Sequence, residues 1–301
     1  MTELVSKRPL VSFIVASYNY ARYVGTTLAS ILSQTISDFE VIVIDDASTD
    51  NSLDVIQSFH DSRIRLIANE TNSGIVATYN KGLSLARGEY ITFVDADDWI
   101  EPSKIEQQLA FFRENPQIAI VGTYVKAYDA DGGRQPNPDF EEYWNRQHDF
   151  NLTETWIGQN RLNACSPLIA RRVFDEIGYR DATLAIVSDY EFWVRAHARG
   201  FTFGMIDRPL ICYRIHDKNV SMSDPRTVFL ELCYVMQKTI LPSIEDRYAM
   251  HLLTRAIRWV IEHPQFGLLR HEQAHRLLAI LRGKPSVDCL QFKRAVLSAD
   301  E

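Results

Sequence analysis

The chain has 301 residues, of which 46% are hydrophobic and 24% charged, a composition typical of a folded globular protein. Its formal net charge of -7 argues against a general nucleic-acid binder, which needs a basic surface to displace phosphate counterions. The four cysteines show no close pairing, so the sequence predicts neither a zinc site nor a disulfide framework and favours a reducing, cytoplasmic setting.

The sequence contains no obvious targeting or membrane segment. Residues 1–9 are polar and lack the apolar core of a signal peptide. No window has the roughly 18 apolar residues that a membrane-spanning helix needs. We therefore expect a soluble protein, or one that is at most peripheral on the inner face of a membrane.

Strand and helix patterns alternate along the first hundred residues. Short apolar runs predict buried strands at Leu10–Ala16, Glu40–Ile44, Arg63–Ala68 and Tyr90–Val94. Helical spacing of apolar residues predicts helices at Ala21–Gln34, around Val55–Phe59 and at Ile75–Ala86. This alternation predicts an α/β fold with a mostly parallel, Rossmann-like sheet that is covered by helices on both faces.

The second half of the chain is less regular. We expect a helix from Pro102 to about Glu114, a strand at Ile118–Tyr128 and an irregular, proline-containing segment at Pro136–Phe150. A short strand from Leu168, helices from Arg172 and Asp189, and two strands near Phe203 and Leu210 follow, before a helical stretch from about Pro225. The predicted organisation is a domain at 1–220, with halves 1–100 and 101–220, and a helical C-terminal extension at 221–301.

Polar residues follow three of the predicted strands, namely Ser17-Tyr18-Asn19, Asp45-Asp46 and Asp95-Ala96-Asp97-Asp98. Ligands of open parallel sheets bind beyond the carboxyl ends of the strands, so these clusters predict a binding site at one edge. The first turn lacks the glycines of a dinucleotide-binding fingerprint, and no phosphate-binding P-loop is present, which argues against NAD and FAD.

The two carboxylates of Asp95-Ala96-Asp97 suit a divalent cation. Hard oxygen ligands favour Mg²⁺ or Mn²⁺, which keep water and substrate phosphates in their remaining coordination positions. One carboxylate can face a ribose while the other faces the cation. The alternative is that these acids only cap the helix that begins near Pro102.

Four ordered segments resemble family 2 of the inverting GT-A glycosyltransferases. These segments are Val11–Asn19, Phe39–Asp50, the run Asn72-Ser73-Gly74 with Asn80-Lys81-Gly82 and Ala86–Tyr90, and Phe93–Asp98. The resemblance covers about the first hundred residues, and a weaker match continues to Ser221. It implies a GT-A fold and a nucleotide-diphospho-sugar donor, with a UDP-sugar as the first choice, and it makes 1–100 the donor-binding half.

The resemblance also implies roles for individual residues. Tyr18 would pack near the base, Ser17 and Asn19 would shape the pocket, and Asp46 would accept a hydrogen bond from the base. Asn80 belongs to the same donor-binding set, Asp95 would contact the ribose, and Asp97 would bind the metal. The structural alternatives are a half-buried aromatic for Tyr18 and a turn residue for Asp46.

A downstream segment, Ser188–Trp193, resembles the region where the family carries an acidic pair whose second member is the catalytic base. Asp189 matches the base, whereas Ser188 replaces the usual first acid. A structural reading competes, because Ser188 with Glu191 forms the pattern of a capping box and an acid in the first helical turn is favoured by the helix dipole. The two readings are compatible.

The run Tyr213-Arg214-Ile215-His216-Asp217, followed by Ser221, resembles a late block of the family. His216 would contact the metal or the diphosphate, and Arg214 would offset phosphate charge. The alternative for His216 is a structural histidine at a strand end.

The implied reaction is a single in-line displacement, in which Asp189 deprotonates an acceptor hydroxyl that attacks the anomeric carbon with inversion. We expect an inverting hexosyltransferase of polysaccharide or glycolipid synthesis, acting on a carbohydrate or lipid-linked acceptor. The alternatives are an inactive GT-A scaffold, which Ser188 favours, and a nucleotidyltransferase-like protein, which would need a basic glycine-rich loop that is absent here.

The C-terminal stretch Leu268–Leu281 combines apolar and basic residues at helical spacing, with further basic residues at Arg282 and Lys284. Such a helix can lie on an anionic membrane surface, where lipid-linked acceptors reside. A packed helix with a solvated charged face is the alternative.

Overall fold

The structure is a computed structural model that describes residues 8–219, 224–243, 254, 268–281 and 288–297. The chain forms two compact units. The first, here called the sheet unit, consists of Met1–His148, Leu162–Tyr179 and Phe201–His216. The second, the helical unit, consists of Asp149–Arg161, Arg180–Gly200 and Asp217–Glu301. These units are interleaved along the chain and are not divided at one residue, so they do not test the predicted boundary at residue 220, which stays a prediction.

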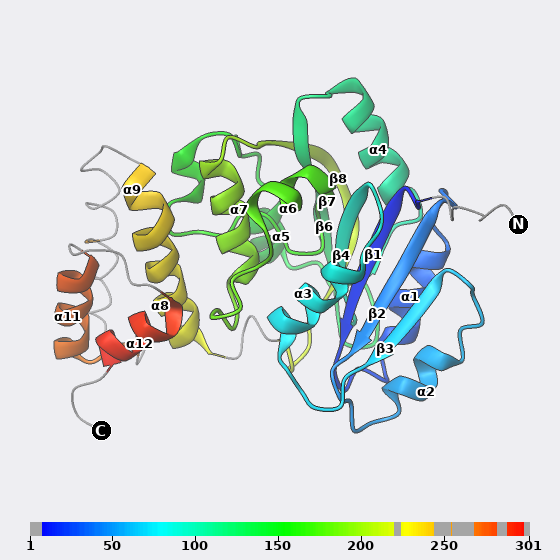
Figure 1. Cartoon of the computed structure of the whole chain (residues 1–301), viewed down its shortest axis with the longest axis horizontal. Coiled ribbons are helices and arrows are strands. Elements are labelled where there is room, and N and C mark those ends of the chain that lie inside the picture. The colour runs from blue at the N-terminus through cyan, green and yellow to red at the C-terminus, as the bar shows by residue number, and fades with distance from the viewer. Residues whose placement is uncertain (1–7, 220–223, 244–253, 255–267, 282–287, 298–301) are drawn as a thin grey trace, which may run out of the picture. The chain divides into compact units, whose positions relative to one another are not determined.

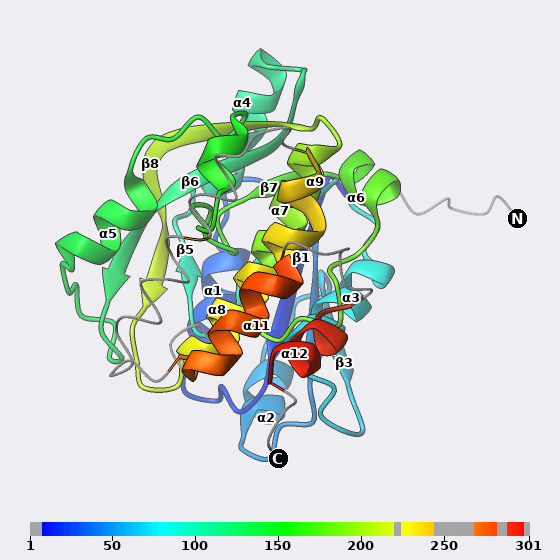
Figure 2. The same ribbon diagram turned by 90° about the vertical axis from the view of Figure 1, so that its left-hand side faces the viewer.

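The described part of the sheet unit is built on one sheet of eight strands in the order β3-β2-β1-β4-β7-β6-β8-β5 (Figures 1 and 2). The strands are β1 (Val11–Ser17), β2 (Phe39–Asp45), β3 (Ile64–Ala68), β4 (Tyr90–Asp95), β5 (Trp99–Ile100), β6 (Ile118–Tyr128), β7 (Leu168–Ala170) and β8 (Thr202–Arg214). Neighbours among β3, β2, β1 and β4 are parallel, β6 pairs parallel with β8, and β7 and β5 pair antiparallel with their neighbours.

The register of the parallel strands decides where the polar clusters lie. Ser17 at the end of β1 pairs with Asp45 at the end of β2, and Ala16 pairs with Asp95 at the end of β4. Every residue of β1 and β2 is buried, which is why both strands appear in the sequence as continuous apolar runs. The three predicted polar clusters therefore begin at neighbouring strand ends on one edge of the sheet.

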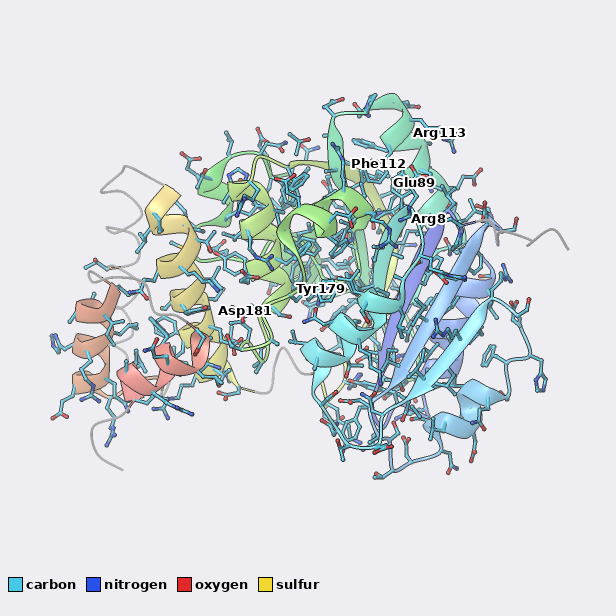
Figure 3. All side chains as sticks on the ribbon, in the orientation of Figure 1. Arg8, Glu89, Phe112, Arg113, Tyr179 and Asp181 are labelled. Atoms are coloured by element: carbon cyan, nitrogen blue, oxygen red, sulfur yellow. The ribbon has the colours of Figure 1, made fainter. Side chains whose placement is uncertain are left out.

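Helices cover both faces of the parallel strands, as predicted (Figure 1). α3 (Ile75–Leu85) packs on β1 and β2, whereas α1 (Val24–Leu32), α2 (Ser52–Gln57) and α4 (Lys104–Glu114) contribute to the core on the other face. On α4, Phe112, labelled in Figure 3, contacts the ring of Tyr90 in this core at a centroid distance of 4.9 Å.

Two local predictions in the second half of the sheet unit were wrong. The predicted irregular segment contains α5 (Pro138–Asn145), because Asn137 caps the helix by accepting a hydrogen bond from Phe140 N and Pro138 fits the first turn. The two strands expected near Phe203 and Leu210 form the single strand β8, which continues past Pro209 through register shifts against β6. The short helix α6 (Arg171–Ile177) completes the unit.

The helical unit contains α7 (Ser188–Ala198), α8 (Pro225–Val235), α11 (His271–Leu281) and α12 (Cys289–Leu297), with the short helices η1 (Thr153–Trp156), η3 (Met236–Ile240) and α9 (Leu241–Ser243). α12 packs on both α8 and α11, and η3 packs on α7 (Figures 1 and 2). Arg282 and Lys284 of the predicted basic stretch lie outside the described residues. Among the residues that are described, no helix has the length and apolar character needed to cross a membrane.

Candidate active site

The turn after β1 carries three of the predicted donor-binding residues. Ser17 is buried, and within the described structure its hydroxyl has no hydrogen-bond partner, whereas 43% of Tyr18 is exposed. Asn19 adopts a left-handed backbone conformation with φ 58°, and its Oδ1 accepts hydrogen bonds from Thr49 N at 2.8 Å and Asp50 N at 3.3 Å. The turn thus offers an exposed aromatic ring and an unsatisfied hydroxyl, while Asn19 fastens the loop after β2.

Asp46 organises the loop that precedes α3. Its buried carboxylate accepts hydrogen bonds from Asn69 Nδ2 at 2.7 Å, Ser73 N at 2.9 Å and Gly74 N at 2.8 Å. Burial raises the pKa of Asp46, but the hydrogen bonds from these three residues outweigh it, and the pKa lies below the ordinary value of 3.8. A hydrogen bond from a nucleotide base to Asp46 would have to replace one of these contacts.

Asp95 lies at the end of β4 and is held from two sides. The hydroxyl of Tyr79 on α3 donates a hydrogen bond to its carboxylate, and its backbone N–H donates to Sγ of Cys165 at 3.2 Å. Asn80, which follows Tyr79, is half-buried on the same helix. The sequence predicted Asp95 at a strand end, but its tertiary partners Tyr79 and Cys165 were not predicted, and the donor-binding role of Asn80 stays a prediction.

The structure brings Asp97 and His216 together, while the roles at the metal that the resemblance implied for them stay predictions. Nε2 of His216 lies 2.9 Å from Oδ2 of Asp97, and both side chains are almost fully buried. The His216 ring stacks on Tyr23 at a centroid distance of 5.1 Å, and the Tyr20 hydroxyl hydrogen-bonds to Asp97. Burial, followed by the charges of Asp97 and Asp95, raises the pKa of Tyr20, so this hydroxyl keeps its proton and acts as a donor.

Arg214 holds the acidic turn from its buried position at the end of β8. Its backbone N donates to Oδ1 of Asp98 at 2.8 Å, and its Nε donates to the carbonyl of Asp97 at 2.8 Å. The guanidinium lies over the rings of Tyr23 and Trp99, at 4.7 Å from each centroid. These contacts place a permanent positive charge beside Asp97 and Asp98.

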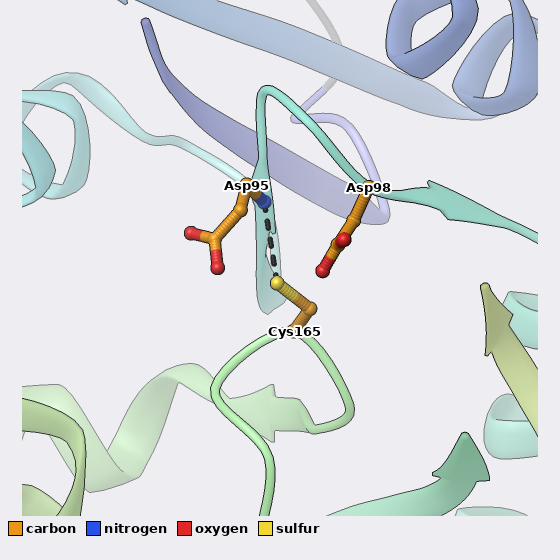
Figure 4. A group of neighbouring side chains, drawn as sticks. All are labelled: Asp95, Asp98 and Cys165. Carbon is orange, nitrogen blue, oxygen red and sulfur yellow. Dashed lines mark hydrogen bonds between the residues drawn. The ribbon is translucent and has the colours of Figure 1, made fainter. Parts of the chain in front are cut away.

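Among the described residues, Asp95, Asp98 and Cys165 bring a carboxylate oxygen each and a thiol sulfur within 4.8 Å of one another (Figure 4). Oδ2 of Asp98 is buried without a hydrogen-bond partner in the described structure. Burial raises the pKa of Asp98 well above its ordinary value, and the charges of Asp97 and Asp95 raise it further. The unpartnered Oδ2 of Asp98, close to the carboxylate of Asp95, fits a hard divalent cation.

Asp189 lies in the helical unit, in the first turn of α7. Its half-buried side chain accepts a hydrogen bond from Asn160 Nδ2 at 2.7 Å. Burial raises the pKa of Asp189 above the ordinary value of 3.8, although the charge of Arg180 and the hydrogen bonds from Tyr190 N and Asn160 oppose that shift. A carboxylate with a raised pKa is better suited to accept a proton near neutral pH.

The predicted capping box at the start of α7 was wrong. The N-cap residue is Val187, and no side chain caps this helix end. Ser188 is already helical, and the carboxylate of Glu191 instead pairs with Arg195 one turn later at 2.9 Å. The purely structural reading of this segment therefore loses its main support, although an acid does occupy the first turn as expected.

The sequence model of glycosyl transferase family 2 matches residues 12–178, more than half of the chain. The chain belongs to glycosyl transferase family 2. The match includes the three polar clusters at the strand ends, whereas Asp189, Arg214 and His216 lie beyond it.

Individual glycosyltransferases that are similar to this chain agree with this assignment. The chain is 29% identical over 275 residues to the UDP-Glc:alpha-D-GlcNAc-diphosphoundecaprenol beta-1,3-glucosyltransferase WfaP of Escherichia coli, covering 89% of this chain and 97% of WfaP. TarS of S. aureus, solved with UDP-GlcNAc, superposes with a TM-score of 0.68 at 20% identity, covering 95% of this chain and 81% of the solved chain.

A mannosyltransferase of Pyrobaculum calidifontis, solved with GDP-Man and Mn²⁺, superposes with a TM-score of 0.56 at 16% identity, covering 92% and 74% of the two chains. The two structural matches show that this family 2 glycosyltransferase has the predicted GT-A fold.

The sequence-based prediction did not include four residues that contact or adjoin the candidate site residues: Tyr20, Tyr79, Asp98 and Cys165. Asp98 stood in the acidic run, and its position beside two other acids was the available signal. Tyr20 and Tyr79 are direct neighbours of predicted residues. Cys165 follows β4 by 70 residues and occurs in no motif, so only the fold brings it to Asp95.

Proposed function

We propose that this glycosyltransferase uses a nucleotide-diphospho-sugar, with a UDP-sugar as the first candidate, and that it transfers the sugar with inversion in a metal-dependent reaction. The observation that carries most weight is the cluster of Asp95, Asp97 and Asp98 at the carboxyl ends of the parallel strands in a family 2 chain. A diphosphate brings negative charge, so a cation among these acids is needed to accommodate it.

The turn after β1 and the loop after β2 would hold the nucleoside. The exposed ring of Tyr18 offers a surface on which a base can stack, and the unsatisfied hydroxyl of Ser17 offers a hydrogen bond. Asn19 and Asp46 would both fix the surrounding loops, and Asp46 would also contact the base. Asn80 and Asp95 would complete the donor site, and Asp95 would contact the ribose. UDP is supported by the ligands named for WfaP and TarS.

The residues that would hold the metal are Asp97 and His216, with the carboxylates of Asp95 and Asp98 adjacent. Burial raises the pKa of the nearby Cys165 thiol well above its ordinary value, so this thiol keeps its proton and is not counted as a ligand. The donor set of carboxylate oxygens and one imidazole fits Mn²⁺ or Mg²⁺, and the P. calidifontis mannosyltransferase was solved with Mn²⁺. When bound, the cation would neutralise the charge of the leaving diphosphate. Arg214 would assist by keeping the acidic turn in place and by offsetting part of its charge.

Asp189 is proposed to be the general base. Its carboxylate takes the proton from the acceptor hydroxyl while that oxygen bonds to the anomeric carbon, and the bond from this carbon to the diphosphate oxygen breaks. The electron pair of the broken bond leaves with the nucleoside diphosphate. Because only one displacement occurs, the configuration at the anomeric carbon is inverted.

The acceptor is proposed to be a carbohydrate or a lipid-linked sugar at the cytoplasmic side of a membrane. WfaP, whose acceptor is a diphosphoundecaprenol-linked sugar, supports the lipid-linked form. On α11, Leu277 and Leu281 are buried, whereas the neighbouring Arg270 and His275 are exposed. Because Leu277 and Leu281 are buried in the protein, a membrane contact through this helix would rely largely on its basic residues.

Calorimetry with UDP and Mn²⁺ tests the donor and metal assignments together. We expect Asp97→Asn to weaken UDP binding at least about tenfold, because the amide keeps the size of the side chain but is a poor cation ligand. Chelation of the metal should weaken binding by the wild-type protein to a similar degree. Asp54→Ala, which removes an exposed acid of α2, is the matched control and should bind normally. Equal affinity in all samples would contradict the metal assignment.

A further inference from the structure

The segment that leads into α7 is held by a carboxylate from the C-terminal helices. Three successive backbone N–H groups point at Glu231 on α8. Ala185 N donates to its Oε1 at 2.8 Å, while Ile186 N and Val187 N donate to its Oε2 at 2.9 Å and 3.0 Å. Consecutive N–H groups that converge in this way form an anion-binding concavity, and here the anion is a side chain.

Glu231 is fully buried, so its charge needs compensation. Lys293 on α12 provides it, with Nζ 2.6 Å from Oε1 of Glu231. An apolar residue of similar volume would serve the packing of α8 at lower desolvation cost. We therefore infer that the carboxylate serves to bind the backbone N–H groups of residues 185–187 rather than to pack α8.

The beginning of the same segment is tied to the C-terminal helices as well. Asp181, labelled in Figure 3, accepts hydrogen bonds from Lys238 Nζ at 2.9 Å and from the Tyr234 hydroxyl at 3.2 Å. Two residues later, Oγ1 of Thr183 accepts a hydrogen bond from Cys289 N at 3.1 Å. Residues 181–187 are thus attached to α8, η3 and α12 at positions 181, 183 and 185–187.

We propose that Glu231, with Lys293 as its counter-ion, is a positioning residue for Asp189. This inference rests on the proposed role of Asp189 as the base. Val187, the last residue that Glu231 holds, is the N-cap of α7 and stands two positions before Asp189. The C-terminal helices, which lie beyond the matched region 12–178, thereby become part of the catalytic apparatus.

The variant Glu231→Gln tests this role in the full-length protein. The amide has the same shape, but it replaces one acceptor oxygen by an NH₂ group that faces N–H donors. We expect kcat to fall about 10- to 100-fold, because small displacements of a catalytic group have effects of this size. The KM for the donor should stay within about twofold, because the donor residues belong to the sheet unit.

Two further variants separate positioning from stability. Val296→Ala shortens a buried side chain of α12 that takes part in none of the hydrogen bonds to residues 181–187, so it should lower the melting temperature and leave kcat within about twofold. In Glu231→Gln combined with Lys293→Gln, no unpaired ammonium group remains. This double variant should regain melting temperature while its kcat stays low, which keeps the test valid if the single variant folds poorly.

A double-mutant cycle with Asp189→Asn supplies the decisive comparison. If Glu231 acts through the base, Glu231→Gln should reduce kcat little further once Asp189 is replaced. The proposal is overturned if the folded Glu231 variants keep normal kcat, or if Glu231→Gln reduces kcat by the same factor in both backgrounds. Full turnover in Asp189→Asn alone would instead contradict the proposed base, whatever Glu231 does, so the two failures are distinguishable.

Discussion

At the scale of single residues, the environment of Asp189 combines opposing influences on one carboxylate. Burial disfavours the charged form and raises its pKa. The charge of Arg180 and the hydrogen bonds from Tyr190 N and Asn160 favour the charged form and limit that rise. The proposed base must be ionised before it can accept a proton, so under that proposal this balance sets the acidic limit of activity.

Asn160→Ala should therefore move the acidic limb of the pH profile of kcat to higher pH. Loss of the donated hydrogen bond destabilises the ionised carboxylate, the pKa of Asp189 rises further, and more of the base is protonated at a given acidic pH. Steady-state kinetics across the acidic range would measure the shift, with Gln159→Ala, an exposed neighbour, as the control. An unchanged limb in Asn160→Ala would show that a different group sets it.

At the scale of elements, the contact of α3 with β1 and β2 explains part of the family pattern. Gly82, in the run Asn80-Lys81-Gly82, lies in the middle of α3, where glycine is unfavourable for a helix. A Cβ atom at this position would come within 2.4 Å of Cγ2 of Ile14, a fully buried residue of β1. Glycine here allows the helix that carries Tyr79 and Asn80 to approach the sheet closely.

Gly82→Ala should consequently destabilise the protein by about 1–2 kcal/mol, because overpacking against the β1 residue costs more than the gain in helix propensity. Urea unfolding would measure the change in the free energy of unfolding. Ser84→Ala is the matched control, since this exposed position of α3 should change stability by less than about 0.5 kcal/mol. A Gly82→Ala protein as stable as the control would disprove the close-approach argument.

At the scale of the whole molecule, the parallel half of the sheet was the most predictable part. β1, β2 and β4 are buried on both faces, so their sequences are continuous apolar runs that end in polar residues. Because parallel strands end at the same edge, the order of these runs also predicted that Asp46 and Asp95 would lie at that edge. In this part of the chain, the apolar runs predict the strands and the parallel arrangement predicts where their polar ends lie.

Other parts depended on contacts that no local pattern records. β5 has only two residues, and β8 contains the polar run before Pro209, so neither resembles an isolated strand. Cys165 and Glu231 have their roles through partners distant in sequence, namely Asp95 and the backbone of residues 185–187. In the sequence, nothing distinguishes this cysteine from other cysteines or this glutamate from other acids on helices.

The most direct test of the account is the turnover of nucleotide sugars by the wild-type protein and by Asp189→Asn. UDP release from UDP-sugars would be measured with carbohydrate and lipid-diphosphate-linked acceptors in the presence of Mn²⁺. We predict acceptor-dependent UDP release by the wild type, and a fall of roughly 10²–10⁴-fold in Asp189→Asn with UDP binding retained. Undiminished turnover in Asp189→Asn would contradict the proposed base, and UDP binding without turnover across the whole panel would favour an inactive scaffold.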